Sequence, residues 1–118
     1  MQIDRSNDQL LMRLLDATAL RGKVIAGNIA NSNTPGFKRQ VVEFEDLLRE
    51  AVGRGPEAMA KVVPRVITDV ESPSSFDGNN VTLEGEITAQ EENRLMYELF
   101  ASILATKAEM MRASIEER

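Results

Sequence analysis

The chain has 118 residues, enough for one domain, with a formal net charge of −5 at pH 7 and basic residues spread along its whole length. Dispersed basic residues do not form the positive patch that a nucleic acid partner requires. The absence of histidine and cysteine excludes imidazole general bases, thiolate nucleophiles, disulfides and the usual zinc and iron sites. We therefore expect no enzyme activity, no cofactor and no small-molecule substrate.

The sequence shows no targeting segment and no membrane span. Residues 1–5 lack a basic stretch followed by an unbroken apolar run, so no cleavable secretory signal is predicted. Charged residues interrupt every apolar stretch before the roughly 18 residues that a transmembrane helix needs. If the protein leaves the cytoplasm, another export route must carry it.

The N-terminal third, to about residue 33, has the pattern of an amphipathic helix. Ser6 and Gln9 have the spacing of a capping box. Met12 and Leu20 lie outside the main apolar stripe, where a lone subunit leaves them exposed. The stripe itself recurs on one face with a period of 3.6 residues and contains Leu10, Leu11, Leu14, Leu15, Ile25 and Ile29.

The middle of the chain is interrupted by proline and glycine and predicts short elements only. Residues 41–52 have a pattern typical of a short helix, or of a strand that turns into a helix, and Gly53 follows them. Residues 64–70 and the pair Val81 and Leu83 have a strand-like composition. Any sheet formed by these residues is expected to be small.

The C-terminal third, from about Thr88, predicts a second amphipathic helix. Thr88 and Glu91 have capping-box spacing, and negative charge in the first turn suits the helix dipole. Periodicity leaves two interpretations open: a helix enclosed by several neighbours, or a wide face buried in a compact helical domain. The apolar residues cover an arc of about 200 degrees, wider than one partner helix can cover: Leu95, Met96, Leu99, Phe100, Ile103, Leu104, Met110, Met111 and Ile115.

The two terminal helices have similar expected lengths of about 25 residues, or about 38 Å. We therefore expect a mainly α fold in which long N- and C-terminal amphipathic helices pack as an antiparallel hairpin or coiled coil. An irregular middle segment, with a short helix and small β elements, is expected to project from one end of that hairpin.

An uncharged segment of fourteen residues, 24–37, contrasts with a chain that is 28% charged. Asn28, Asn31 and Asn33 offer hydrogen-bond donors and acceptors without the desolvation cost of a charge, which suits a buried polar contact. Residues 34–37, Thr-Pro-Gly-Phe, predict a type II turn, because proline presets the first central φ and glycine tolerates the positive φ of the second. The turn ends the helix, and similar turns also occur at ordinary helix ends.

Two segments resemble a known family. Residues 28–37, Asn-Ile-Ala-Asn-Ser-Asn-Thr-Pro-Gly-Phe, look like the signature N-[IL]-A-N-x-x-T-P-G-[FY] of the axial proteins that form the rod, hook and hook-filament junction of the bacterial flagellum. Residues 77–81, Asp-Gly-Asn-Asn-Val, resemble a D-G-N-x-V segment of the proximal rod type within that family. Asn93 with Tyr97 also agrees with an N-x-x-x-Y pattern of that type.

The resemblance implies a single rod-subunit domain, residues 1–118, with an N-terminal helix and asparagine-rich turn (1–36), an irregular middle (37–87) and a C-terminal helix (88–118). It implies a structural component of the proximal rod that assembles helically with itself and with other axial proteins, and that transmits torque from the motor to the hook and filament. The helices of the free monomer are then expected to be loosely ordered, because their partners are other subunits.

The resemblance also implies where the subunit is and what it meets. Export through the flagellar type III apparatus without a cleaved signal would place it in the periplasmic rod of the basal body, in contact with the rod-base adaptor protein and the membrane ring. The residues predicted to carry assembly contacts come from the two motif segments and the apolar arc: Asn28, Ile29, Asn31, Asn33, Thr34, Pro35, Gly36, Phe37, Asp77, Gly78, Asn79, Leu99, Phe100, Ile103, Leu104 and Met111.

Two other functions fit parts of the sequence. Another rod subunit of the same family would share the N-terminal signature, and Thr82 and Gly85 stand where the proximal type commonly has charged residues. The D-G-N segment favours the proximal type. From a different class, an adaptor or chaperone with a helical hairpin would share the amphipathic ends, but it would not need the turn at residues 34–37.

Enzyme function has only weak candidates among the carboxylates. Glu84 with Glu86, and Asp69 with Glu71, lack a spacing distinctive of a catalytic pair. We expect these side chains to be solvated surface charge.

Overall fold

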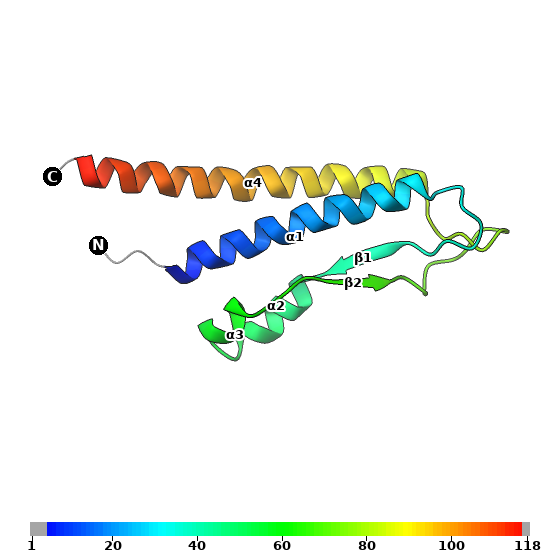
Figure 1. Ribbon diagram of the computed structural model, residues 1–118, viewed down its shortest axis with the longest axis horizontal. Helices are drawn as coiled ribbons and strands as arrows, with labels where there is room; N and C mark the ends of the chain where they lie inside the picture. Colours follow the sequence, from blue (N-terminus) through cyan, green and yellow to red (C-terminus); the bar gives the residue numbers. More distant parts are fainter. Residues whose placement is uncertain (1–4, 117–118) are drawn as a thin grey trace.

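The computed structural model describes residues 5–116 as two long helices and a short middle segment (Figure 1). The elements, in chain order, are α1 (Arg5–Ala30), β1 (Gln40–Glu43), α2 (Glu45–Val52), α3 (Pro56–Ala60), β2 (Arg65–Thr68) and α4 (Leu83–Glu116). α1 and α4 lie side by side and antiparallel, in an elongated, flat molecule with extents of 66 × 29 × 14 Å. The predicted mainly α hairpin is confirmed. No helix in this part of the chain has both the length and the apolar character needed to cross a membrane.

The buried face of α1 follows the predicted apolar stripe. Leu11, Ala17 and Ile25 are buried. Met12 is 52% exposed, as its position outside the stripe predicts, whereas Leu20, for which the same exposure was predicted, is half-buried. The capping contact predicted for Ser6 involves a side chain outside the part of the structure that is described. The remaining stripe residues are half-buried: Leu10, Leu14, Leu15 and Ile29.

α4 contacts α1 through side chains spaced alternately three and four residues apart, as in a coiled-coil seam. Asn93 donates from Nδ2 to the Thr18 carbonyl oxygen over 2.8 Å, and the Lys107 Nζ lies 2.7 Å from a carboxylate oxygen of Asp8. The seam is therefore partly polar. Its half-buried apolar residues, in the same register, are Phe100, Leu104 and Met111.

α4 begins at Leu83, well before the predicted start at Thr88, and its 34 residues exceed the 26 of α1. The Glu86 N–H donates to the Thr82 carbonyl oxygen over 3.0 Å and closes the first turn. Gly85 weakens the helical pattern here because glycine has low helix propensity. A Cβ at Gly85 would lie 2.5 Å from the Thr82 hydroxyl oxygen, so glycine leaves room for that side chain.

The middle segment contains a two-stranded antiparallel sheet. β1 pairs with β2, with Gln40 opposite Thr68, and α2 follows β1, which confirms the predicted strand that turns into a helix. The strand predicted within residues 64–70 is present as β2. The strand predicted at Val81 is wrong, because that residue lies in the loop before α4. α3 was not predicted; Pro56 opens it, since the first helical position needs no N–H donor.

The middle segment folds back along α1, which corrects the prediction that it projects from the end of the hairpin (Figure 1). Val42, Phe44 and Ala51 are its buried apolar residues. Arg21 of α1 donates from Nη2 to the Val42 carbonyl oxygen over 3.1 Å. Burial of apolar side chains beside α1 enlarges the core of a chain too small to depend on one helix seam.

Candidate assembly site

The predicted turn follows α1 and has the expected geometry. The Phe37 N–H donates to the Thr34 carbonyl oxygen over 3.2 Å, and Gly36 has a φ of 76°, as a type II turn requires. Asn31 ties the turn to the helix, because its Nδ2 donates to the Gly27 carbonyl oxygen over 2.8 Å. Its Oδ1 accepts a hydrogen bond from the Thr34 hydroxyl over 3.1 Å.

The second motif segment packs directly against this turn. The Gly36 N–H donates to the Asp77 carbonyl oxygen over 2.9 Å. Asn79 donates from Nδ2 to the carbonyl oxygens of Asn31 and Thr34, over 2.8 and 2.9 Å. The fold therefore brings together the two segments that carry the family resemblance. We call residues 31–37 and 77–80 the joint.

Two glycines meet inside the joint. Gly78 has a φ of 88°, and a Cβ on it would lie 3.4 Å from the Cα of Gly36. Both residues need a left-handed backbone, which glycine adopts without steric cost. Lys38 adds a cross-link, since its Nζ donates to the Gly78 carbonyl oxygen over 2.5 Å.

Asn28 is 1% exposed and joins three elements. Its amide exchanges two hydrogen bonds with the Gln40 backbone: Nδ2 donates to the carbonyl oxygen over 2.8 Å, and Oδ1 accepts from the N–H over 2.9 Å. Nδ2 also donates to Oε2 of Glu86 over 3.2 Å. The predicted buried polar contact is confirmed at Asn28, whose amide fixes the end of α1 to both β1 and α4.

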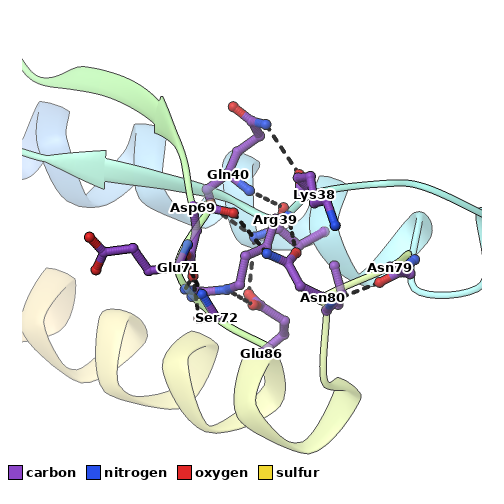
Figure 2. A network of polar contacts seen from close by, with 11 residues as sticks. Lys38, Arg39, Gln40, Asp69, Glu71, Ser72, Asn79, Asn80 and Glu86 are labelled. Carbon is purple, nitrogen blue, oxygen red and sulfur yellow. Dashed lines mark hydrogen bonds and ion pairs between the residues drawn. The ribbon is translucent and has the colours of Figure 1, made fainter. Parts of the chain in front are cut away.

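A cluster of ion pairs centred on Arg39 continues this connection (Figure 2). The Arg39 Nε donates to Oε1 of Glu86, and Nη1 donates to Oδ2 of Asp69, each over 2.8 Å. Asn80 completes the cluster: its Oδ1 accepts from the Arg39 N–H over 2.6 Å, and its Nδ2 donates to the Asp69 carbonyl oxygen over 2.7 Å. We call Asn28, Arg39, Asp69, Asn80 and Glu86 the polar cluster.

The expectation that Glu86 and Asp69 are solvated surface charges is wrong. Glu86 is 1% exposed, and the Asp69 side chain is 13% exposed. A carboxylate can be buried only when ion pairs and hydrogen bonds replace its water, and Arg39 supplies both. Within residues 5–116, no group of three or more acidic side chains could hold a metal ion.

The contacts within the cluster favour the charged forms of Arg39 and Asp69. Burial opposes the charge on Arg39, but the hydrogen bonds and charges of Asp69 and Glu86 outweigh it and raise the guanidinium pKa. Hydrogen bonds from the Ser72 hydroxyl and from Arg39 hold the pKa of Asp69 well below its usual value. The cluster is therefore an ionic link in which the Arg39 guanidinium bridges the side chains of Asp69 and Glu86 and holds the fold.

The predicted assembly residues fall into inner and outer groups. On α4, Leu99 and Ile103 are 52% and 39% exposed, whereas Phe100, Leu104 and Met111 lie in the seam with α1. In the joint, Asn79 is buried, and the half-buried residues are Ile29 just before it, Asn31, Phe37 and Gly78. The exposed residues of the joint are Asn33, Thr34, Pro35, Gly36 and Asp77.

Large apolar side chains lie exposed along one side of α4, at spacings that place them within about 100 degrees of one another around the helix axis. The exposed fractions of these residues lie between 39% and 65%. We call this strip the outer face; it consists of Leu95, Met96, Leu99, Ile103 and Met110, and Ile115, which is 69% exposed, lies on another side of the helix. The wide predicted arc thus has one part packed on α1 and another without a partner inside the described subunit.

Sequence reasoning missed Arg39, Asn80 and Glu86 as members of the site. Asn80 occupies the variable position of the D-G-N-x-V segment, so the motif does not specify it, and only its place next to Asn79 was a signal. Glu86 precedes the buried Asn93 by one heptad, and this spacing places it on the buried side of α4 once the helix is extended to Leu83. Arg39 carries no comparable local signal.

Comparison with known proteins identifies related chains. Residues 11–38 match the family model described as flagella basal body rod protein. The chain is 34% identical to flagellar basal body rod protein FlgB of Borrelia hermsii, with 89% of this chain and 92% of that protein covered. It is 32% identical to FlgB of Borreliella burgdorferi, with 79% and 83% covered.

A match to a different rod protein, FlgG, covers much less of the two chains than the FlgB matches do. Flagellar basal-body rod protein FlgG of Caulobacter vibrioides is 55% identical, but the match covers 55% of this chain and 19% of that protein. The FlgB matches above extend over most of both chains, in agreement with the interpretation of the D-G-N segment as one of the proximal rod type. The chain therefore belongs to the family of flagellar basal body rod protein FlgB, and it is a structural component of the rod in the bacterial flagellar basal body.

Proposed function

We propose that this chain is a proximal rod subunit that assembles helically with copies of itself and with other rod proteins, and transmits torque from the motor toward the hook and filament. The observation that carries this proposal is the outer face of α4. A row of large apolar side chains along a long helix is the surface that a neighbouring helix can cover.

Burial of the outer face supplies the driving force for assembly. Each square ångström of apolar surface removed from water stabilises the assembly by about 25 cal/mol. Leu99 and Ile103 act in this outer contact, whereas Phe100, Leu104 and Met111 act inside the subunit by holding α4 on α1. The same helix thus joins the subunit internally and joins it to its neighbours.

The joint sets the geometry of this assembly. Asn33, Thr34 and Pro35 are exposed on a turn that hydrogen bonds hold in one shape. A rigid exposed turn loses little conformational entropy when a neighbouring subunit binds it. In this proposal the turn contacts the next subunit, and Asn28 and Asn79 keep it in position.

The place of the subunit follows from this role. It is exported by the flagellar type III apparatus without a cleaved signal, lies in the periplasmic rod, and meets the rod-base adaptor protein and the membrane ring. It catalyses no reaction. These statements rest on the family membership together with a site that is built of packing surfaces and ion pairs.

Deletion of the gene tests the function directly. Purified basal bodies of the deletion strain should show membrane rings without rod, hook or filament by electron microscopy, and the cells should not swim. Expression of the full chain from a plasmid should restore all three structures. A deletion strain that keeps its rods and swims would reject the proposed function.

A further inference from the structure

The helical hairpin has a groove between α1 and α4 that its own side chains do not fill. The groove has a volume of about 270 Å³ and is lined mainly by apolar atoms. On the α1 side it is lined by small residues, Ala19 and Gly22. Asn93 and Tyr97, the pair that agrees with the N-x-x-x-Y pattern, line it on the α4 side. The groove therefore has room for large side chains from outside the subunit.

The same groove contains two buried hydrogen-bond acceptors that lack a donor. Asn93 is 9% exposed, and its Nδ2 donates to the Thr18 carbonyl oxygen, but its Oδ1 accepts no hydrogen bond within residues 5–116. Oε1 of Gln90, about one helical turn earlier, is also buried and accepts none from those residues. A buried acceptor is unfavourable until a donor reaches it. The groove thus suits an occupant that combines apolar side chains with a hydrogen-bond donor.

The outer face of α4 combines these two properties. Ile103 and Met110 are exposed one heptad apart, and Thr106 is exposed between them on the same side of the helix. Thr106 therefore adds a hydroxyl donor to a row of large apolar side chains. A single polar residue in an apolar helix seam fixes the register of the two helices, because it must meet a polar partner.

The outer face and the groove lie on opposite sides of the seam that joins α1 and α4 (Figure 1). At about 100 degrees per residue, the outer face lies about 100 degrees to one side of the seam residues Phe100 and Leu104. Gln90, Arg94 and Tyr97, which line the groove, lie about 70 degrees to the other side. One copy of the chain can therefore present its outer face to a second copy while its own groove stays open to a third.

We propose that the groove between α1 and α4 receives the outer face of α4 from a second copy of the chain, with the Thr106 hydroxyl donating to the acceptors of Gln90 and Asn93. The contact deepens the proposed rod function and rests on it. Because the two surfaces differ, the contact is heterologous, and its repetition builds a ring or an open helix.

The register of the contact follows from its polar pair. Heterologous copies point the same way along the assembly axis, so their α4 helices run parallel. Thr106 reaches Gln90 and Asn93 when the two helices are displaced by about 15 residues, or about 22 Å. Ile103 and Met110 then lie on the side of the small residues Ala19 and Gly22, so that large side chains meet small ones.

Chemical cross-linking tests this register, because the natural chain has no cysteine. Glu98→Cys and Glu109→Cys place thiols at exposed positions beside the groove and beside the outer face. Within one subunit the two thiols are about 16 Å apart along α4, beyond the reach of a short bismaleimide. In cells that build rods from this double variant, the reagent should give a ladder of covalent multimers. The matched control, Glu98→Cys with Glu50→Cys on α2, should give no ladder.

Filling the groove makes the cross-linking specific. Ala19 is exposed, so Ala19→Leu should leave the unfolding midpoint unchanged, but its side chain occupies the groove and should remove the ladder. Ala105→Leu, the same change at an exposed alanine of α4 outside both surfaces, should keep the ladder. A ladder that survives Ala19→Leu, or one no stronger than the Glu50→Cys control, would overturn the proposal. So would a cross-link from position 109 to a protein of a different mass, because another protein would then cover the outer face.

The hydroxyl of Thr106 has a test of its own. Thr106→Val keeps the shape of the side chain but removes the donor, so two buried acceptors lose their partner. The amount of subunit that a titratable plasmid must supply for half of the normal swimming speed should rise about 10-fold. Thr106→Ser keeps the hydroxyl and should need the natural amount. Equal requirements for the two variants would contradict the hydrogen bond across the contact.

A comparison with the deletion strain separates this inference from the proposed function. If the deletion strain builds rods, the proposed function itself is wrong. If the deletion strain lacks rods while the Ala19→Leu and Thr106→Val strains build them normally, the groove is not an assembly contact and the rod function stands.

Discussion

The polar cluster ties the first turn of α4 to the rest of the subunit through Glu86, whereas the outer face lies farther along α4 and has no partner within residues 5–116. The cluster buries charged and amide groups and satisfies them within the subunit, as Arg39 does for Glu86. The outer face leaves apolar side chains such as Leu99 in solvent. Stability of the lone subunit is therefore concentrated where α4 begins, while the capacity to bind neighbours is concentrated farther along.

Of the variants considered, Arg39→Ala should reduce the stability of the subunit most. Arg39→Ala leaves the buried carboxylate of Glu86 without its ion pair, so the free energy of unfolding should fall by about 3–5 kcal/mol in urea titrations. The control is Arg94→Ala, which removes two exposed ion pairs on α4, the helix that carries Glu86, and should cost about 1 kcal/mol or less. Equal losses in the two variants would show that the cluster has no special role.

Gly36→Val should give the next largest effect. The positive φ of 76° is unfavourable for valine, which should cost about 1–3 kcal/mol and impair rod assembly while export stays measurable. A Cβ at Gly36 meets no atom within 4 Å, so strain of the backbone is the tested cause. Gly27→Ala is the control, because that glycine is helical and has equal space; the variant should be as stable as the natural chain or more stable. Normal swimming of the Gly36→Val strain would contradict the proposed role of the turn.

Acid should weaken the polar cluster through Asp69. The folded-state pKa of Asp69 lies below its unfolded value of about 3.9, so the unfolded chain binds a proton first as the pH falls. The contribution of Asp69 to stability is present above pH 4 and is lost as the pH falls further toward the folded-state pKa. Unfolding measured between pH 6 and pH 3 should therefore show a shallower decline for Asp69→Asn than for the natural chain. Parallel declines would contradict the assignment.

The smallest effect on the isolated subunit should come from the outer face. Leu99→Gln keeps a good helix former at an exposed position, so the unfolding free energy should change by less than about 0.5 kcal/mol, yet rods should not assemble. Leu104→Gln places the same change in the seam and should cost about 1–2 kcal/mol. If Leu99→Gln destabilises the monomer as much as Leu104→Gln does, the two faces of α4 are not distinct.

The sequence predicted those features of the fold that depend on interactions between residues close together in the chain. The stripe on α1 follows helical periodicity, and residues 34–37 form the turn that proline and glycine favour. The start of α4 was misplaced because Gly85 weakens the helical signal there, although contacts between distant segments stabilise this turn. The burial of Glu86 depends on Arg39, 47 residues away in the chain, and no pattern of neighbouring residues reports such a partner.

The long-range hydrogen bonds of the joint determine when it can form during folding. Asn79 reaches carbonyl groups 45 and 48 residues away in the chain, so closing the joint requires a long loop to lose its freedom first. Helices α1 and α4 need only local contacts and form on a faster timescale. The joint should therefore close after α1 and α4 have formed. The subunit reaches its final shape only when the two motif segments, residues 31–37 and 77–80, come into contact.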